Sequence, residues 1–317
     1  MTGPTFLVVG AGRSGTTGLV EGLRGHPEVF VTTPKEPDHL AYAGQQLAFR
    51  GPGDDLAVNR PAVTGLADYL ALYPSDGGFT ALGEASVSTL YHYERAIPGI
   101  QRIAPDARIV VLLREPVARA HSAFDYLAGQ GRESAPTLLD AVADEDRRVR
   151  DGWAHLWHYT RMSRYADAVE AFLEAFGPDR VGVWFHDNLS DDYPGTLGQV
   201  LRFVGTAPHP GELDRVPVVN VSGTPRSRLV HGAMQAARGN EAVRRLGQRV
   251  TTFRVREALR RRLVTKHDVD PGVRRELEPL FADDLARLSR LLPAEGQPDW
   301  LRAARDDVPR PSSARAR

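Results

Sequence analysis

The 317-residue chain contains no cysteine, and this absence excludes several kinds of protein at once. Without thiols there can be no disulfide, no thiolate metal site and no cysteine nucleophile. Lysine is also rare, because only Lys35 and Lys266 occur and arginine carries nearly all of the positive charge. The remaining composition is that of an ordinary globular protein, with 42% hydrophobic and 25% charged residues.

The chain also lacks long apolar runs and a net charge. No stretch approaches the ~18 apolar residues that a membrane-spanning helix needs. The N-terminus shows no basic region or cleavage site of a secretion signal. Lys and Arg number 40 against 40 Asp and Glu, which argues against a general polyanion binder. We therefore expect a cytoplasmic protein with no membrane span and no nucleic-acid partner; the sequence does not indicate its oligomeric state.

Buried strands alternate with helical patterns along most of the chain. The predicted strands are short apolar runs, typical of parallel strands covered on both faces, at Phe6–Val9, Val29–Val31, Arg108–Leu113 and Val181–Phe185. Helical patterns occur at Val117–Leu127, Thr137–Arg150, Met162–Phe176, Thr196–Val204 and Val273–Leu292. The alternation predicts an α/β fold, with a P-loop-like three-layer arrangement of helices on both faces of a central parallel sheet. We expect a single domain over residues 1–305 and a disordered tail over 306–317.

A glycine loop directly follows the first predicted strand. Gly10 and Gly15 frame the segment, and a helical pattern begins after it. Such a loop forms a phosphate cradle, because backbone N–H groups point inward and the helix N-terminus is partly positive. The nucleoside-triphosphate version needs a lysine after the second glycine, but Thr16 stands there and Arg13 is the loop's only cation. The alternative is a bare structural turn.

An arginine ends the clearest predicted strand. Arg114 follows Leu113, and Ser122 lies in the helix that comes next. In P-loop kinases a strand beside the first often ends in an aspartate that helps hold Mg²⁺. An arginine at this edge of the sheet binds an anion directly, and the Ser122 hydroxyl could add a hydrogen bond. The alternative is a surface arginine beside a buried serine.

Together these segments resemble the sulfotransferases that use 3′-phosphoadenosine 5′-phosphosulfate (PAPS), particularly bacterial relatives of the heparan-sulfate sulfotransferase domain. The glycine loop is similar to the family's 5′-phosphosulfate loop, and Arg114–Ser122 fits its 3′-phosphate motif, R-x-P-x-x-R-x-x-S. Segments around Lys35-Glu36-Pro37, Glu84, Asn220–Arg226 and Phe281–Leu288 before Trp300 also match, so the resemblance covers about residues 5–300. It implies PAPS as donor and 3′-phosphoadenosine 5′-phosphate (PAP) as product. The donor-binding residues that it implies are Arg13, Ser14, Gly15, Thr16, Thr17, Arg114, Ser122, Ser222, Gly223 and Arg226.

Three positions depart from the family's pattern. Arg13 stands where members often carry lysine, which keeps the charge but changes its geometry. Ala85 stands where eukaryotic members usually place a lysine after the glutamate that matches Glu84. The Lys-Glu-Pro segment commonly continues with His-Phe-Phe, whereas Asp38-His39-Leu40 follows here and shifts the histidine by one residue.

Sulfuryl transfer depends mainly on positioning and on stabilising the charge that grows on the leaving oxygen. We expect Arg13 and the loop's amides and hydroxyls to supply that stabilisation without a metal. The acceptor hydroxyl also needs a proton acceptor within about 3 Å. Glu36 is the first candidate base, because it follows the second strand and matches the glutamate with this role in the heparan-sulfate relatives. The other candidate catalytic residues are Lys35, His39 and Glu84.

We therefore expect a bacterial PAPS-dependent sulfotransferase whose acceptor is a hydroxyl, or as second choice an amine, of a carbohydrate or small molecule. A P-loop small-molecule kinase and a non-catalytic nucleotide-binding protein are the alternatives. Two segments stay open. His155 and His158, within an aromatic patch, could be ordinary packing, an acceptor-facing wall or a metal pair. The arginine-rich stretch 244–262 could be a solvated helix face, a surface that steers an acidic acceptor or a contact with nucleic acid.

Overall fold

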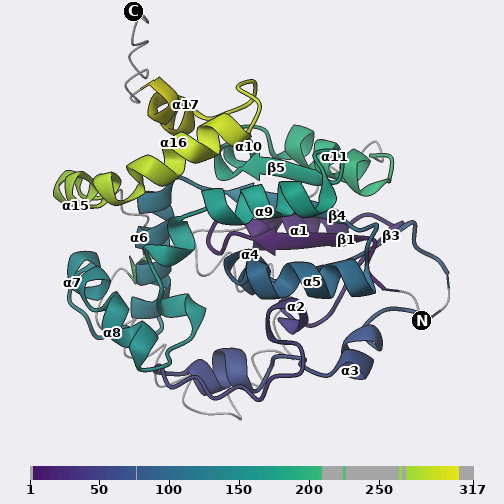
Figure 1. Cartoon of the computed structure of the whole chain (residues 1–317), viewed down its shortest axis with the longest axis horizontal. Coiled ribbons are helices and arrows are strands. Elements are labelled where there is room, and N and C mark those ends of the chain that lie inside the picture. Colours follow the sequence, from purple (N-terminus) through teal and green to yellow (C-terminus); the bar gives the residue numbers. More distant parts are fainter. Residues whose placement is uncertain (1–2, 76, 209–223, 226–263, 266–268, 307–317) are drawn as a thin grey trace, which may run out of the picture.

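A five-stranded parallel sheet organises the fold (Figure 1). The computed structural model describes residues 3–75, 77–208, 224–225, 264–265 and 269–306. The strand order is β2–β3–β1–β4–β5, which places β1 at the centre. The strands are β1 (Phe6–Gly10), β2 (Val29–Val31), β3 (Ala81–Ala85), β4 (Arg108–Leu113) and β5 (Val181–Phe185).

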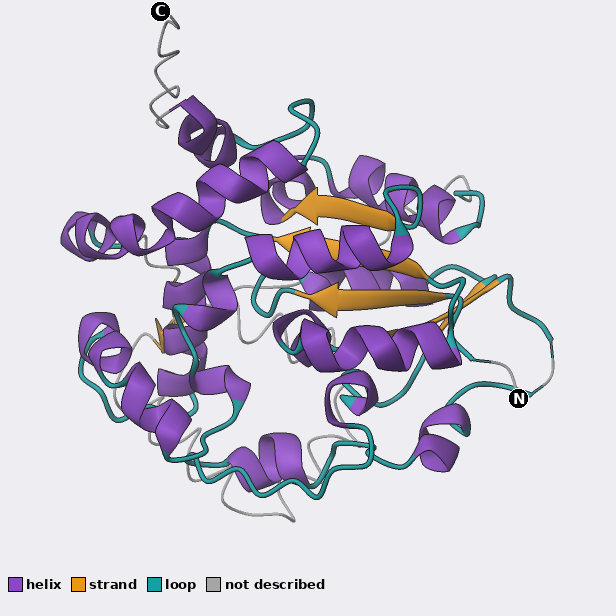
Figure 2. Ribbon diagram, in the orientation of Figure 1, coloured by secondary structure: helices purple, strands orange, loops and turns teal. Residues whose placement is uncertain are grey.

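The apolar side chains of the central strands build one core on each face of the sheet. Leu7 and Val9 of β1 pack into a cluster with helices α5, α9 and α16. Phe6 and Val8 pack into the opposite cluster with α1 and α11. Figure 2 shows helices on both sides of the sheet, so the expected three-layer α/β fold is confirmed. These helices are α1 (Thr16–Arg24), α5 (Tyr93–Ile103), α9 (Ala166–Phe176), α11 (Tyr193–Val204) and α16 (Ala282–Leu291).

Shorter elements surround this framework. Helix α6 (Pro116–Ala128) follows β4 in the chain. The Glu115 carboxylate caps the start of α6 by accepting from the amides of Val117 and Ala118. The other short helices are α2 (His39–Tyr42), α3 (Leu66–Leu70), α4 (Val87–Tyr91), α10 (His186–Asp191), α15 (Pro271–Leu277) and α17 (Asp299–Asp306). Tighter or wider turns occur at η1 (Asp55–Asn59), η2 (His155–Trp157), η3 (Arg161–Ser163) and η5 (Glu278–Phe281). A two-stranded antiparallel sheet joins β6 (Thr224–Pro225) to β7 (Val264–Thr265).

Two predicted helices were wrong in extent. The helix predicted over 137–150 is divided into α7 (Leu138–Ala143) and α8 (Glu145–Arg150). Asp144 lies between them, and its carboxylate pairs with Arg147 and Arg148 of the second helix. The helix predicted from Met162 begins only at Ala166, where the Asp284 carboxylate accepts from the amides of Tyr165 and Ala166 and so caps α9.

The pattern over 273–292 and the position of Glu84 also need correction. Pro279 has no amide hydrogen to donate, and the turn η5 separates α15 from α16 there. Glu84 lies inside β3, a strand that was not among the four predicted ones and that pairs with strands on both of its edges. Helix α17 extends past Trp300 to Asp306, the first residue of the predicted tail, and residues 307–317 lie outside the described residues.

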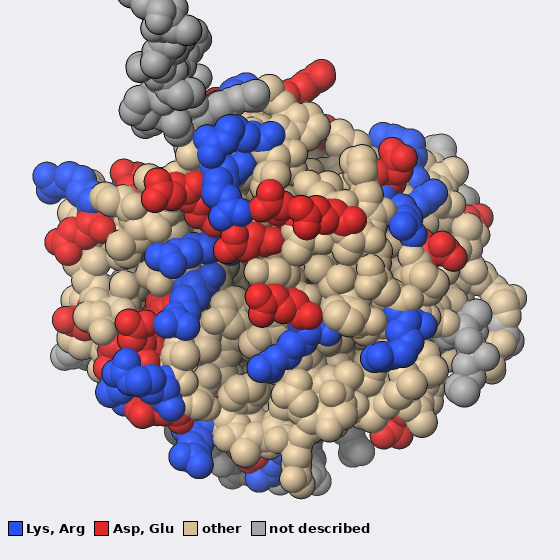
Figure 3. Space-filling view, in the orientation of Figure 1, with Lys and Arg blue, Asp and Glu red and all other residues tan. Residues whose placement is uncertain are grey.

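Charges of both signs are interspersed on the face of the molecule that Figure 3 shows. Arg287 of α16, for example, pairs with Asp167 and Glu170 of α9 at 2.7 Å each. This mixture is consistent with the zero net charge of the chain. Within the described ranges, no helix is both long enough and apolar enough to cross a bilayer.

Candidate active site

The glycine loop connects the central strand β1 to the start of α1. Gly10 has φ of 147°, and a Cβ there would lie 2.8 Å from the Cβ of Leu90, so only glycine fits this turn. Gly15 precedes α1 with φ of 98°, which is a left-handed conformation. Between them, the Ser14 hydroxyl is buried and has no hydrogen-bond partner in the described structure. The loop thus presents an unsatisfied polar group beside the positive end of a helix.

Arg13 brings the two sequence signals together. Its Nε donates to Ser122 Oγ at 3.3 Å, and its guanidinium carbon lies 4.4 Å from the ring centroid of Tyr126. Arg114 donates from Nη1 to the carbonyl of Arg13 at 3.1 Å. Burial lowers the pKa of Arg114 from its usual value, so an anion beside it would be favoured. The loop and the arginine-serine motif therefore form one site.

A fully buried arginine, Arg119, holds the glycine loop in place. Arg119 of α6 donates to Ser163 Oγ and to the carbonyls of Tyr159 and Gly12. The last of these contacts ties α6 to the glycine loop. Arg119 stands inside the predicted motif, yet its role as an anchor of the loop was not predicted from the sequence.

Glu36 and Asp38 lie side by side at the start of α4. Glu36 forms an ion pair with Lys35 through Oε1, and its Oε2 accepts from the Val87 amide at 2.8 Å. Asp38 accepts through Oδ1 from the hydroxyl of Ser88, the next residue along α4. Consecutive residues of one helix thus anchor the two carboxyl groups. Asp38 was not among the predicted site residues, although its place two positions after Glu36 was a usable signal.

Burial raises the pKa of Asp38 to about 7, and the negative charge of Glu36 adds to this effect. The Ser88 hydroxyl and Lys35 oppose it. Glu36 has a lysine partner, and Asp38 is the more buried of the two carboxyl groups.

The backbone is strained at the charged residues of this site. Among the described residues, those with positive φ other than glycine are Arg13 (71°), Glu36 (63°) and Asp38 (58°). All three line the same cavity, which has a volume of about 340 Å³. Left-handed backbone costs about 1–2 kcal/mol for most residues, and such strain tends to cluster where function requires it. The strain therefore marks this cavity as the candidate active site.

The other two candidate bases do not line the cavity. His39 Nδ1 bonds with the carbonyl of Val63 at 2.9 Å, and its ring stacks on Tyr69 at 4.3 Å. Burial lowers the pKa of His39. Glu84 is buried and accepts from Ser86 Oγ at 2.7 Å, and burial raises its pKa to about 8. Ser86 Oγ also accepts from the amide of Asp38. Glu84 therefore supports the backbone at Asp38 through Ser86.

His155 and His158 have different surroundings. His155 lines the cavity, and its Nδ1 lies 2.8 Å from the hydroxyl of Tyr42, which also contacts His92. His158 Nδ1 bonds with the hydroxyl of Tyr91 at 2.8 Å. Burial lowers the pKa of both histidines, so both are neutral at pH 7. His155 thus contributes a neutral polar group to the cavity wall.

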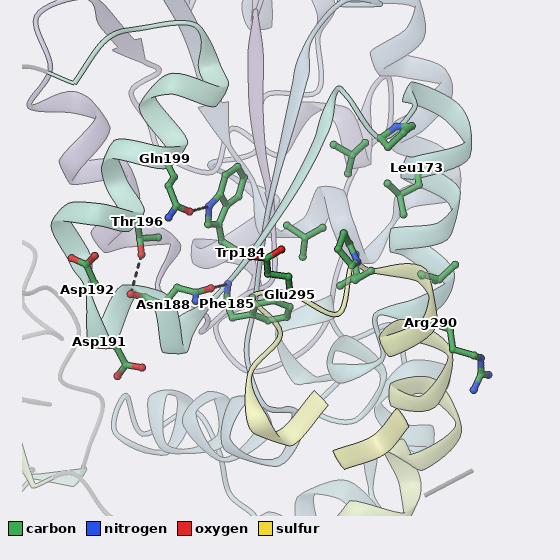
Figure 4. A pocket seen from close by; sticks show the side chains of 17 residues that line it. Leu173, Trp184, Phe185, Asn188, Asp191, Asp192, Thr196, Gln199, Arg290 and Glu295 are labelled. Carbon is green, nitrogen blue, oxygen red and sulfur yellow. Dashed lines mark hydrogen bonds between the residues drawn. The ribbon is translucent and has the colours of Figure 1, made fainter. Parts of the chain in front are cut away.

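Of the remaining predicted residues, some line the cavity and others lie outside the described residues. Thr16 and Thr17 line the cavity with the loop. Ser222, Gly223, Arg226 and the arginine-rich stretch 244–262 lie outside the described residues. A larger cavity of about 790 Å³ lies against β5, and none of the predicted site residues lines it (Figure 4). Its walls include Trp184, which donates from Nε1 to Gln199.

The fold and the site agree with comparisons to known proteins. Residues 4–210 match the sulfotransferase family, and the chain belongs to this family. Mouse heparan sulfate glucosamine 3-O-sulfotransferase 6 is 29% identical over 204 residues, which cover 64% of this chain and 52% of that protein. Mouse carbohydrate sulfotransferase 15 is 29% identical over 160 residues, covering 41% of this chain and 28% of that protein. The chain therefore spans about half or less of these two relatives.

Solved structures extend the similarity over nearly the whole chain. A sulfotransferase from Alicyclobacillus acidocaldarius superimposes with a TM-score of 0.69 and 26% identity, covering 92% of this chain and 96% of that chain. Mouse sulfotransferase SULT7A1 complexed with PAP gives a TM-score of 0.51 at 15% identity, covering 96% of this chain and 87% of that one, and so shares the fold. The predicted membership of the sulfotransferase family is confirmed.

Proposed function

We propose that the protein transfers a sulfuryl group from PAPS to a hydroxyl group of a carbohydrate or small-molecule acceptor. The observation that carries this proposal is the contact of Arg13 with Ser122, which are 109 residues apart in the chain. It brings together two elements that we expect to bind anions, as a nucleotide with two separate anionic groups requires. The glycine loop would hold the 5′-phosphosulfate, and Arg114 with Ser122 would hold the 3′-phosphate.

The loop is suited to an anionic donor. Amides at the start of α1 point away from the helix and need partners, and the helix end is partly positive. Arg13 supplies a fixed cation at the same loop, where negative charge would grow on the leaving oxygen.

In the proposed reaction, Glu36 accepts the proton of the acceptor hydroxyl. The acceptor oxygen forms a bond to sulfur as the bond between sulfur and the 5′-phosphate oxygen breaks, and PAP leaves with the electron pair. Glu36 is preferred to His39 and Glu84 because its carboxylate lines the cavity that contains the loop. Lys35 would hold Glu36 in place through their ion pair. That the reaction proceeds without a metal stays a prediction.

The kinase alternative has less support. Thr16 stands where a kinase loop needs lysine, and Arg114 stands where it often has an aspartate for Mg²⁺. The test is transfer of label to a panel of hydroxyl acceptors, from radiolabelled PAPS without Mg²⁺ and from radiolabelled ATP with Mg²⁺. We expect transfer from PAPS alone. Transfer from ATP alone would establish a kinase, and nucleotide binding without any transfer would support a non-catalytic protein.

The cytoplasmic location and the bacterial source stay predictions from the sequence. So does the single domain over residues 1–305, with the tail that follows it.

A further inference from the structure

One face of helix α6 contacts the side chain of Arg13 at two points. Tyr126 lies four residues after Ser122, about one helical turn, so the two side chains lie on the same face of the helix. Ser122 Oγ accepts from Arg13 Nε at 3.3 Å. The guanidinium carbon of Arg13 lies over the Tyr126 ring, 4.4 Å from its centroid. The serine therefore contacts the edge of the guanidinium and the tyrosine contacts its flat face.

The backbone of Arg13 is held independently of its side chain. Its φ of 71° is left-handed, and its carbonyl accepts from Arg114 Nη1 at 3.1 Å. The carbonyl of the preceding residue, Gly12, is contacted by the buried Arg119. Since these contacts fix the main chain, the place of the guanidinium depends on the torsions of a long side chain. Ser122 and Tyr126 limit those torsions.

An aromatic ring holds a cation without using its hydrogen-bond donors. The cation–π contact acts on the face of the guanidinium, whereas its N–H donors lie in the plane. A ring also does not neutralise the cation, as a carboxylate partner would. Arg132, another arginine of the cavity lining, shows that contrast, because it pairs with Asp54 at 2.9 Å. Tyr126 can thus orient Arg13 and leave its positive charge to act on the cavity that both residues line.

The contact suits arginine better than lysine. A guanidinium is planar and weakly hydrated and stacks on an aromatic face, whereas an ammonium group is a compact, strongly hydrated point charge. The geometry at Arg13, with one N–H bonded in the plane and a ring against the face, matches a guanidinium. The ring therefore gives this position a defined orientation that the charge alone would not.

Building on the sulfotransfer proposed above, we propose that Tyr126 is a positioning residue for that reaction. Its ring holds the Arg13 guanidinium in the orientation that stabilises the leaving oxygen. Negative charge grows on that oxygen as its bond to sulfur breaks, and a cation that is already oriented stabilises it without rearranging. Tyr126 acts through Arg13, so its loss should lower turnover more than it weakens nucleotide binding.

Three variants of α6 separate the ring of Tyr126 from its hydroxyl group and from the helix. Tyr126→Leu removes the ring and Tyr126→Phe keeps it. Phe124→Leu is the matched control, because it removes a ring that packs against Tyr159 and that points away from the face of Tyr126, two residues along the helix. Tyr126 is only half-buried, and leucine preserves apolar contact there, so the variants should fold.

Turnover is measured with saturating radiolabelled PAPS and the acceptor of the panel above that the parent protein uses fastest. Hydrolysis of PAPS by water is measured alongside, because it needs no other acceptor, and PAP affinity is measured by calorimetry. We expect Tyr126→Leu to lower kcat about 5–30-fold and to change PAP affinity less than about threefold. Tyr126→Phe and Phe124→Leu should keep kcat within about threefold of the parent.

A double-mutant cycle tests whether the ring acts through Arg13. In the Arg13→Ala background, Tyr126→Leu should lower kcat by less than about twofold more. A further loss as large as the loss in the parent would show that the ring acts by another route, and would overturn the proposal. Tyr126→Phe as slow as Tyr126→Leu would also overturn it.

The outcomes separate this proposal from the one on which it rests. A parent protein that binds PAP but neither hydrolyses PAPS nor transfers its sulfuryl group would contradict the sulfotransferase function, and the role of Tyr126 with it. Transfer by the parent with kcat unchanged in Tyr126→Leu would contradict the role of Tyr126 alone.

Discussion

The substitution Asp38→Asn is expected to stabilise the protein in a pH-dependent way. In the folded protein, burial first and the charge of Glu36 second raise the pKa of Asp38 from 3.8 to about 7. The folded state therefore binds this proton more tightly than the unfolded chain does. Consequently the stability of the parent protein falls as the pH rises from about 4 to about 7, and the loss is complete above the folded pKa.

The size of the effect follows from the pKa shift. A rise from 3.8 to about 7 is roughly three units, each worth ~1.4 kcal/mol, so ionised Asp38 costs the fold ~4 kcal/mol at most. Asparagine stays neutral at every pH. It also tolerates the positive φ of this position, and its Oδ1 can still accept from Ser88. The local geometry should survive the exchange.

Urea unfolding of the parent and Asp38→Asn at pH 5 and pH 8 measures this effect. We expect the variant to gain stability relative to the parent as the pH rises, by ~2–4 kcal/mol between the two conditions. Glu84→Gln is a comparison of the same sign, because burial raises the pKa of Glu84 from 4.5 to about 8, so this variant should also gain stability between pH 5 and pH 8. A stability difference between parent and Asp38→Asn that does not change from pH 5 to pH 8 would refute this reasoning.

Three further predictions concern the site and its support. Glu36→Gln should lower turnover ~10²–10⁴-fold while PAP affinity persists; near-normal turnover, with loss in His39→Ala instead, would assign the base to the histidine. Arg13→Ala should reduce turnover, measured with saturating PAPS, by ~10²-fold or more and PAP affinity by less; the opposite pattern would make Arg13 only an anchor. Asp54→Ala should destabilise the fold by about 3–5 kcal/mol in urea unfolding, because Arg132 loses its buried partner; a change below about 1 kcal/mol would contradict this.

The strands that carry the glycine loop and Arg114 could be predicted because both are continuous apolar runs. A parallel strand covered on both faces consists almost entirely of apolar residues, and β1 and β4 fit this pattern. In contrast, β3 contains Gly83 and the carboxyl group of Glu84, which weaken any pattern based on hydrophobicity. Its burial depends on neighbours on both sides, which no local window of sequence contains.

The segment Glu36–His39, which contains the proposed base, shows why the rest of the site could not be predicted. Positive φ at Glu36 and Asp38 directs both carboxyl groups to the cavity and leaves His39 to bond with Val63 and stack on Tyr69. Neither glutamate nor aspartate at these positions predicts a positive φ from the sequence alone. The contacts that fix it also come from distant elements, such as Val87 and Ser88 of α4.

The most direct test of the account compares PAP with AMP by calorimetry in the absence of Mg²⁺. The two nucleotides differ in the 3′-phosphate that we assign to Arg114 and Ser122, and a charge-assisted hydrogen bond contributes about 1.5–3 kcal/mol. We predict that PAP binds at least about tenfold more tightly than AMP, and that Arg114→Ala removes most of this preference. Equal affinity of the parent protein for PAP and AMP would contradict the proposed donor site.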